Sequence, residues 1–281
     1  MKTCFATVIY KQAATFFEDL VNSLDSQTDK DFDILFVNDN YTTEELKEMG
    51  VITPDGEKCA LFPSLNGNVI LIDLQQTNLS IPETRIAMLE AAKLLGYDIA
   101  VLGDADDTLS EDRVKLYKKA HEIDKDAVFF YNNFVINDDE SLFKDLPSSA
   151  ASIEAIGQQN FLGLSNTGIC IDKLSLEFIK SLEEGATMVF DWYLFSRILL
   201  DVGGGCLIDG AYTRYRIYEG NIAGANRDIT KEYTIKAKHY EILSTRSKYI
   251  KDLENKLKAI TPGEIIPNND HKGYWWSDIQ L

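Results

Sequence analysis

Short apolar runs alternate with helical segments over the first half of the chain. The runs are rich in β-branched and aromatic residues, as buried strands are, and they span 5–10, 33–37, 69–72, 98–102 and 128–131. Helical spacing and capping residues lie between them, at 15–24, from Thr42, from Pro82 to Gly96, and from Ser110 to about Ile123. Because strands that alternate with helices usually pair in parallel, this order predicts an α/β fold with a mixed, mainly parallel sheet flanked by helices.

Carboxylates gather just after the fourth predicted strand, where Asp104, Asp106 and Asp107 lie close together in the sequence. Asp39 ends the second strand, and ligands of such sheets bind at the carboxyl ends of the strands, so both groups should share one edge. Carboxylates this close repel each other unless a cation lies among them, and hard oxygen ligands favour Mg²⁺ or Mn²⁺. The simpler alternative is a solvated acidic loop ahead of a helix that Ser110 caps.

The balance of residue types excludes several classes of protein. The 281 residues carry a formal net charge of −17, which disfavours nucleic acid as a partner and broad contact with an anionic membrane. The four cysteines are far apart and form no C-x-x-C pair, which excludes a disulfide scaffold and an ordinary zinc knuckle. With no apolar window of about 18 residues and no apolar leader, we expect a cytoplasmic protein without a transmembrane segment.

The second half is less regular than the first. Helices are predicted at 172–182 and 189–200, and a break follows at Gly203-Gly204-Gly205. One long helix is then predicted from Asp228 to Ile260, closed by Pro262. We therefore expect a main domain followed by a C-terminal helical extension with an aromatic tail, divided as 1–224 and 225–281.

The expected long helix differs in charge from the rest of the chain. Between Lys231 and Lys258, eight Lys or Arg and four Asp or Glu give a net charge of +4, which leaves −21 elsewhere. Its apolar positions form one stripe on the helix: Tyr233, Ala237, Tyr240, Leu243, Ile250, Leu253 and Leu257. The stripe predicts a homo-oligomer contact. The alternatives are a peripheral membrane contact and packing on the body, with three lysines facing water: Lys236, Lys248 and Lys251.

Two enzyme classes share a motif or a fold with part of this sequence but do not fit the rest of it. The segment Asp104-Ala105-Asp106-Asp107-Thr108 matches D-x-D-x-T, the nucleophile loop of haloacid-dehalogenase-like phosphatases. That class carries the motif after its first strand and an acidic G-D-x-x-x-D pair downstream, whereas here it follows the fourth strand without such a pair. A sugar nucleotidyltransferase needs a Gly-rich, Arg-containing loop after the first strand, and Lys11-Gln12-Ala13-Ala14 is not one.

The chain resembles the family 2 glycosyltransferases of the GT-A fold, from residue 5 to about residue 224. Six segments carry the resemblance in the family's order: the opening strand Phe5–Tyr10, the second strand Ile34–Asp39, Asn78 with Arg85 as N…G…R, Asp104-Ala105-Asp106-Asp107 as D-x-D-D, Val189-Phe190-Asp191-Trp192 as E-D-W, and Tyr215-Arg216 with Asn221 as Y-R-x-H-x-x-N. The chain departs from the family at three points. Asn38-Asp39-Asn40-Tyr41-Thr42 stands where the family has D-D-G-S-x-D, so one Asp and the Gly are missing. Phe190 replaces the Glu before the base, and the closing His is replaced near Tyr218.

The resemblance implies an inverting, metal-dependent glycosyltransferase of the hexosyltransferase type. It would move a sugar from a nucleoside diphosphate sugar, with a UDP-sugar as default, to a hydroxyl of a saccharide or lipid-linked acceptor. Surface polysaccharide synthesis is the expected setting, with the enzyme cytoplasmic or peripheral at the inner face of the membrane. The alternative is a catalytically inactive sugar- or nucleotide-binding protein on the same fold.

The resemblance also assigns a donor side to the site. Asp106 with Mn²⁺ or Mg²⁺ would neutralise the diphosphate, and Asp104 would position the metal or the ribose. Asp39 would accept a hydrogen bond from the nucleotide base, and Arg85 and Tyr10 would lie on the same side.

The acceptor side rests on fewer residues. Asp191 would be the general base for the acceptor hydroxyl, partly desolvated by Trp192 and the apolar helix that follows. The alternative is an ordinary carboxylate at a helix start. His271 is a candidate late metal ligand. It lies in an otherwise loosely held tail with three aromatic residues: Tyr274, Trp275 and Trp276.

Overall fold

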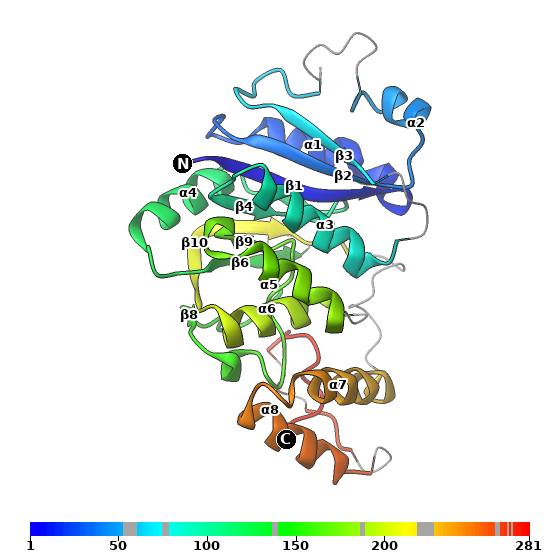
Figure 1. The fold of residues 1–281 in the computed structure, drawn as a ribbon, viewed down its shortest axis with the longest axis vertical. Coiled ribbons are helices and arrows are strands. Elements are labelled where there is room, and N and C mark those ends of the chain that lie inside the picture. The colour runs from blue at the N-terminus through cyan, green and yellow to red at the C-terminus, as the bar shows by residue number, and fades with distance from the viewer. Residues whose placement is uncertain are drawn as a thin grey trace.

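A computed structural model gives the fold, and it describes residues 1–52, 61–74, 79–136, 140–185, 189–217, 228–261, 265–268, 270 and 272–281. Within these ranges, ten strands form one sheet (Figure 1). Its main path runs β3 (Val69–Asp73), β2 (Asp33–Asp39), β1 (Thr3–Tyr10), β4 (Ile99–Leu102), β9 (Thr167–Ile169), β6 (Phe129–Ile136), β10 (Gly205–Arg214) and β5 (Thr108–Leu109). The short strands β7 (Glu140–Ser141) and β8 (Ser149–Ala150) pair with β6 and β10.

Parallel pairing dominates the N-terminal half of the sheet, as the sequence predicts. The four strands β1 to β4 are mutually parallel, whereas β9 runs antiparallel to both of its neighbours. The register of β1 on β2 pairs Tyr10 with Asp39 at their carboxyl ends. On the other side of β1, Ala6 pairs with Leu102, the last residue of β4. The expected edge, where polar residues follow several strands, is therefore formed.

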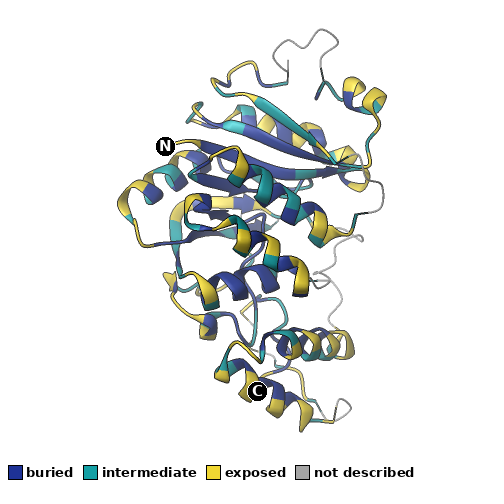
Figure 2. Ribbon diagram, in the orientation of Figure 1, coloured by how far each residue is buried: buried dark blue, intermediate teal, exposed yellow. Residues whose placement is uncertain are grey.

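Helices cover both faces of the sheet (Figures 1 and 2). Alternate residues of β1 enter two separate apolar clusters: Cys4 and Ala6 point to one face, and Phe5 and Ile9 to the other. The helices α1 (Phe17–Asp25) and α4 (Arg113–Ile123) cover the face of Phe5. The opposite face is covered by α3 (Ile81–Leu94), α5 (Leu176–Ser181) and α6 (Phe190–Asp201).

Capping residues set the start of two predicted helices. In α2 (Thr43–Glu48), the Thr42 side chain and Glu45 form a reciprocal capping box. In α3, Ser80 and Glu83 form the same arrangement, and Gly96 follows the helix at φ +74°. These predictions are confirmed, and α3 matters most because its first turns carry Arg85.

Two predicted caps are wrong. The pattern at Thr15 predicts a capping box, but a 3₁₀ turn covers Lys11–Phe16 and α1 starts at Phe17 without a capping side chain. Ser110 does not cap α4: its hydroxyl accepts the Tyr212 N–H instead. The first free N–H groups of α4 find other partners, one of them the Gln27 side chain from the segment after α1.

The sequence patterns do not predict β10. The glycines at 203–205, expected only to break the chain, lead into this strand, and a Cβ on Gly205 would lie 2.4 Å from the Phe129 carbonyl oxygen. The register of β10 on β6 shifts between Leu207 and Tyr212, and Gly210 there has φ +84°. This irregularity disrupts the alternation that identifies a strand.

The prediction of a single long C-terminal helix is also wrong, because the structure has two helices in its place. The chain turns after α7 (Ile229–Leu243), and Ser247 caps α8 (Lys248–Lys258) with its hydroxyl. The helices pack side by side at one end of the molecule (Figure 1). Polar residues at 244–247, between the two halves of the apolar stripe, explain the turn.

The apolar stripe is covered within the chain. Five of its members are buried in the same cluster as the face of the sheet that α3 and α6 cover: Tyr240, Leu243, Ile250, Leu253 and Leu257. These five residues are therefore not exposed for the predicted contact with a second subunit. Lys248 and Lys251 face water as the alternative expects, but Lys236 is fully buried. The expected domain boundary at 224/225 lies outside the described residues. No described helix has the length and apolar composition needed to cross a membrane.

Candidate active site

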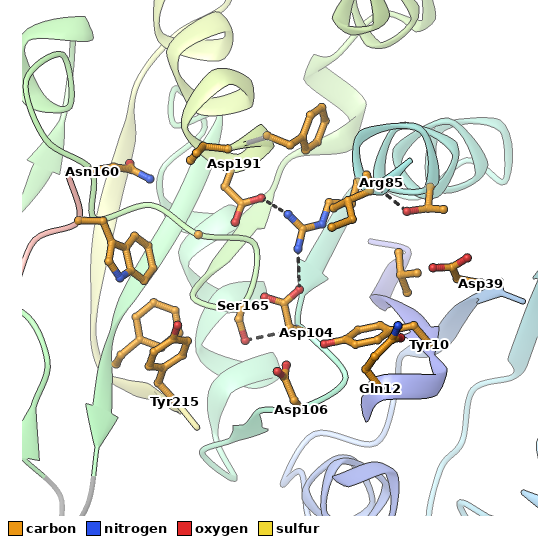
Figure 3. Close-up of a pocket in the computed structure, with 18 of the residues that line it drawn as sticks. Tyr10, Gln12, Asp39, Arg85, Asp104, Asp106, Asn160, Ser165, Asp191 and Tyr215 are labelled. Carbon is orange, nitrogen blue, oxygen red and sulfur yellow. Dashed lines mark hydrogen bonds and ion pairs between the residues drawn. The ribbon is translucent and has the colours of Figure 1, made fainter. Parts of the chain in front are cut away.

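A cavity of about 410 Å³ lies at the carboxyl ends of β1, β2 and β4 (Figure 3). It collects six of the predicted site residues: Tyr10, Asp39, Arg85, Asp104, Asp106 and Asp191. Three others, Asn78, Asn221 and His271, lie outside the described residues. Segments far apart in the sequence thus meet where the sheet topology predicts a binding site.

Arg85 joins two of the predicted carboxylates. Its Nη1 donates to Asp191 Oδ1 at 2.6 Å, and its Nη2 donates to Asp104 Oδ1 at 3.2 Å. Asp191 lies in the first turn of α6, and its second oxygen accepts the Leu164 N–H at 3.3 Å. Asp191 is therefore held by a cation on one side and by a backbone N–H on the other.

The loop after β4 brings Asp104 and Asp106 to the cavity. The Asp104 N–H donates to Ser165 Oγ at 3.3 Å. Burial raises the pKa of Asp104 to about 7; the positive charge of Arg85 opposes this shift, while Asp191 and Asp106 add to it. The site thus holds more negative charge than Arg85 alone balances.

Asp107 differs from its two acidic neighbours because it lies under the loop, 2% exposed. Burial, with the charges of Asp106 and Asp104, raises its pKa well above the usual range. Its Oδ1 accepts the Arg216 N–H at 3.0 Å, and Arg216 Nε donates to the Asp106 carbonyl at 2.9 Å. The Arg216 guanidinium lies 4.2 Å from the Phe16 ring centroid. Arg216 thus fixes the acidic loop, a role that the Tyr215-Arg216 motif does not reveal by itself.

One end of the cavity is formed by the ends of β1 and β2. Tyr10, Gln12 and Asp39 lie on the same side of Asp104 (Figure 3). Partial burial raises the pKa of Asp39, while the Asn40 side chain, which donates to it at 2.6 Å, acts in the opposite direction. Gln12 was not singled out in the sequence, because it lies in a turn with no motif around it.

The opposite end is formed partly by the C-terminal tail, which the sequence predicts to be loosely held. Asn160 and Tyr215 lie on this side of Asp104, away from Tyr10 (Figure 3). Trp275 and Trp276 line the cavity with them. The tail is packed in place: Trp275 pairs with Asn160 through two backbone hydrogen bonds of 2.8 and 2.9 Å. No local pattern in the sequence could place it there.

The residues present suit a divalent cation. Asp104 and Asp106 offer hard oxygen ligands from one loop, as Mg²⁺ and Mn²⁺ prefer. Arg216 and Ser165 hold that loop from two sides. A cation would also offset the charges of Asp191 and Asp106, which add to the effect of burial on the pKa of Asp104.

Comparison with known proteins identifies the fold. No model of a known protein family and no curated protein sequence matches the chain. Among solved structures, S. aureus TarS 1–349 in complex with UDP-GlcNAc is similar, with a TM-score of 0.59 and 16% identity over 86% of this chain and 67% of that one.

Two further structures are similar at lower identity. GalNAc-T7 with UDP, GalNAc and Mn²⁺ has a TM-score of 0.59 and 12% identity, over 94% of this chain and 52% of that one. The mannosyltransferase PcManGT from Pyrobaculum calidifontis, in complex with GDP-Man and Mn²⁺, has a TM-score of 0.55 and 11% identity, over 92% and 69%. The chain therefore spans about half the length of the GalNAc-T7 structure. These likenesses confirm the GT-A glycosyltransferase fold.

Proposed function

We propose that the chain is a metal-dependent, inverting glycosyltransferase that uses a nucleoside diphosphate sugar as donor. One observation carries the proposal: a single cavity brings the acidic loop of Asp104 and Asp106, the cation of Arg85 and the carboxylate of Asp191 together. The GT-A fold supports it, because the similar structures hold UDP-GlcNAc, UDP or GDP-Man.

The donor diphosphate would lie against the acidic loop. Asp104 and Asp106 would hold Mn²⁺ or Mg²⁺, and the cation, when bound, neutralises the charge that develops on the leaving diphosphate. Mn²⁺ is present in the GalNAc-T7 and PcManGT structures. Tyr10 and Asp39 would bind the nucleoside at the β1–β2 end of the cavity, where Asp39 accepts a hydrogen bond from the base. UDP is the default nucleotide.

Asp191 would accept the proton of the attacking hydroxyl. Its Leu164 N–H contact fixes the carboxylate, and Arg85 draws electron density from the other oxygen. A diphosphate offers Arg85 a second anion, so donor binding would loosen its contact with Asp191 and free that carboxylate oxygen to accept the proton. Attack in line with the leaving group then inverts the anomeric centre.

A catalytically inactive binding protein on the same fold is the second candidate. The 2.6 Å contact of Arg85 with Asp191 favours it, because a carboxylate oxygen engaged by a guanidinium is not free to accept the proton of an acceptor hydroxyl. The replacement of the family's Glu by Phe190 points the same way. Such a protein would bind the donor but would neither transfer nor hydrolyse its sugar.

Several finer assignments come from the resemblance and stay proposals. The acceptor would be a saccharide or a lipid-linked saccharide in surface polysaccharide synthesis, at the cytoplasmic face of a membrane. We also propose a catalytic domain over 1–224 with an extension over 225–281, and His271 as a further metal ligand.

A thermal-shift panel of UDP-, GDP- and dTDP-sugars, each with Mn²⁺ or with EDTA, tests the donor. We expect one nucleotide class to raise the melting temperature with Mn²⁺ only, because a ligand that binds the folded state stabilises it. The best donor is then incubated with the protein, and release of free sugar is measured. Slow hydrolysis supports the transferase, binding without hydrolysis supports the inactive protein, and no shift with any donor contradicts both.

A further inference from the structure

We propose that Trp276 is a stacking surface for the sugar ring of the acceptor, and that Glu232 and Lys236 of α7 are positioning residues that hold it beside the cavity. The inference deepens the proposed function and rests on it, since it names the chemical class of the acceptor. It begins from the difference between the two adjacent tryptophans of the tail.

Trp275 serves to anchor the tail. Its ring packs against Phe134, Phe143 and Tyr215, with centroids 5.6, 5.0 and 6.2 Å away. Its backbone pairs with Asn160 on both sides. Trp275 is thus occupied by contacts within the protein.

Trp276 is placed differently. Like Trp275, it lines the cavity and is partly buried against the apolar core, but within the described residues it makes none of the ring-to-ring contacts that hold Trp275. Its backbone has φ +55°, a left-handed conformation that bulky side chains rarely adopt. Strained residues of this kind persist where the surrounding structure holds them, and they cluster at ligand sites. The left-handed conformation of Trp276 turns the chain between Trp275, whose ring is anchored, and the buried residues 277–279.

Two buried charges of α7 hold the chain just after Trp276. The two oxygens of Glu232 accept the N–H groups of Asp278 and Ile279, at 3.2 and 2.8 Å. Lys236 donates to the carbonyls of Gln158 and Ile279, and its Nζ lies 3.2 Å from Glu232 Oε1. The two side chains are 5% and 0% exposed. Buried charges are costly unless they are paired and hydrogen-bonded. Most of the hydrogen bonds that this pair makes go to the backbone of the tail.

The surroundings of Trp276 suit a neutral sugar ring. A pyranose presents a flat face of C–H groups to an aromatic ring and hydroxyls at its edge. The carboxylate of Asp191 lines the same cavity and can accept hydrogen bonds from those hydroxyls. A lipid chain would instead bring apolar groups against the carboxylate of Asp191.

The position agrees with the direction of the proposed reaction. Tyr10 and Asp39 occupy the end assigned to the donor nucleoside, whereas Asn160 and Tyr215 lie on the other side of Asp104 (Figure 3). Trp276 lines the same cavity and directly follows Trp275, which pairs with Asn160 and packs against Tyr215. We therefore infer that a ring stacked on Trp276 would approach the base from the side opposite the nucleoside.

Saccharide binding is tested directly by saturation-transfer NMR, with methyl glycosides and disaccharides of glucose, galactose, mannose and N-acetylglucosamine. We expect ring protons of at least one saccharide to receive saturation from the wild-type protein. Trp276→Ala should weaken that binding by about tenfold or more. Trp276→Phe, which keeps an aromatic face, should retain most of it. Ile266→Ala, in the same tail but 87% exposed, is the matched control and should bind as the wild type does.

The outcomes separate this inference from the proposed function. Normal Mn²⁺-dependent UDP binding in Trp276→Ala, with saccharide binding lost, supports the stacking surface. Unchanged saccharide binding in that variant overturns it, as does a wild-type protein that binds UDP but none of the saccharides. A wild-type protein that binds saccharide through Trp276 but no nucleotide would refute the proposed function alone.

The positioning role of Glu232 needs a kinetic test. Glu232→Ala should raise the KM for the saccharide while the KM for the donor and kcat stay near wild type, because the tail that carries Trp276 loses two hydrogen bonds while the residues of the donor side keep theirs. Glu232→Gln keeps one oxygen for a tail N–H and should partly restore the saccharide KM. A merely structural role would lower the active fraction, so a fall in kcat with both KM values unchanged would overturn this assignment.

Discussion

Arg85 lies between Asp191 and Asp104, with its two terminal nitrogens 2.6 and 3.2 Å from their carboxylates. Burial lowers the pKa of Arg85, but the charges of Asp191 and Asp104 outweigh that effect and the net shift is upward. The guanidinium therefore stays charged and couples the proposed base to the proposed metal loop. A bound diphosphate would compete for the same cation.

Arg85→Met tests this coupling. Loss of a charge-assisted contact of about 1.5–3 kcal/mol should weaken UDP affinity with Mn²⁺ by roughly 10- to 100-fold. Arg85→Lys keeps the charge but cannot bridge two carboxylates, so it should fall between the wild type and Arg85→Met. Isothermal titration with UDP measures the series. Equal affinity in all three proteins would show that Arg85 does not contact the diphosphate.

Asp106→Asn should abolish metal-dependent donor binding with little loss of fold. The amide removes a negative charge from the cavity but keeps the size of the side chain, so the backbone of the loop that Arg216 binds should be unchanged. UDP affinity of the variant with Mn²⁺ should match that of the wild type with EDTA. A variant with normal Mn²⁺-dependent affinity would place the metal elsewhere.

Asp191→Asn should leave donor binding near normal and lower the transfer rate by ~10²–10⁴-fold, the usual worth of a general base. The Leu164 N–H contact can persist with the amide oxygen, which limits structural change. Single-turnover rates at saturating donor measure the effect. Turnover close to wild type would require another base.

Lys236 gives a test of the buried pair through pH. Burial lowers the pKa of Lys236 to about 8, although Glu232 and Asp278 act against this. Between about pH 8 and pH 10.5 the unfolded state therefore holds one proton more than the folded state, and the free energy of unfolding rises with pH.

The sign of this pH dependence follows from proton linkage, and a variant without Lys236 isolates its contribution. Lys236→Met removes this titration, so in that range the wild type should show the more positive slope, by up to about 1.4 kcal/mol per pH unit. Urea unfolding at pH 8, 9 and 10 measures both slopes. Equal slopes would mean that Lys236 keeps its ordinary pKa in the folded protein.

Local patterns were sufficient for the first half of the fold and for most of the acidic site. The apolar run before Asp104 is a short-range feature, and it predicts that Asp104 lies at the end of a strand, as it does. Arg85 is named from the family resemblance, and it lines the same cavity as Asp104. Asp39 is expected beside Asp104 because parallel strands share an edge, whereas Tyr10 is named from the resemblance and lies opposite Asp39 in the register of β1 on β2.

Long-range contacts decided what the sequence could not predict. Lys236 has the spacing of a surface lysine, and its burial depends on the carbonyl of Gln158 and on a tail that returns from beyond α8. The polar residues at 244–247 allow a turn between α7 and α8, but the apolar stripe on both sides of them is also compatible with one straight helix, so packing of both helices against the body decides. Trp276 reaches the cavity only through contacts with residues far from it in sequence.

The most direct test of the account is the position of the metal. A crystal grown with UDP and Mn²⁺ should give an anomalous manganese peak within coordination distance of the Asp106 carboxylate, between Asp104 and the diphosphate. A peak elsewhere would contradict the assignment of the site. The alternative group of ligands is His121, Cys170 and Asp172, whose ligand atoms lie within 4.8 Å of one another. A peak there, with no manganese at Asp106 in crystals that hold UDP, would refute the proposed metal-dependent transfer.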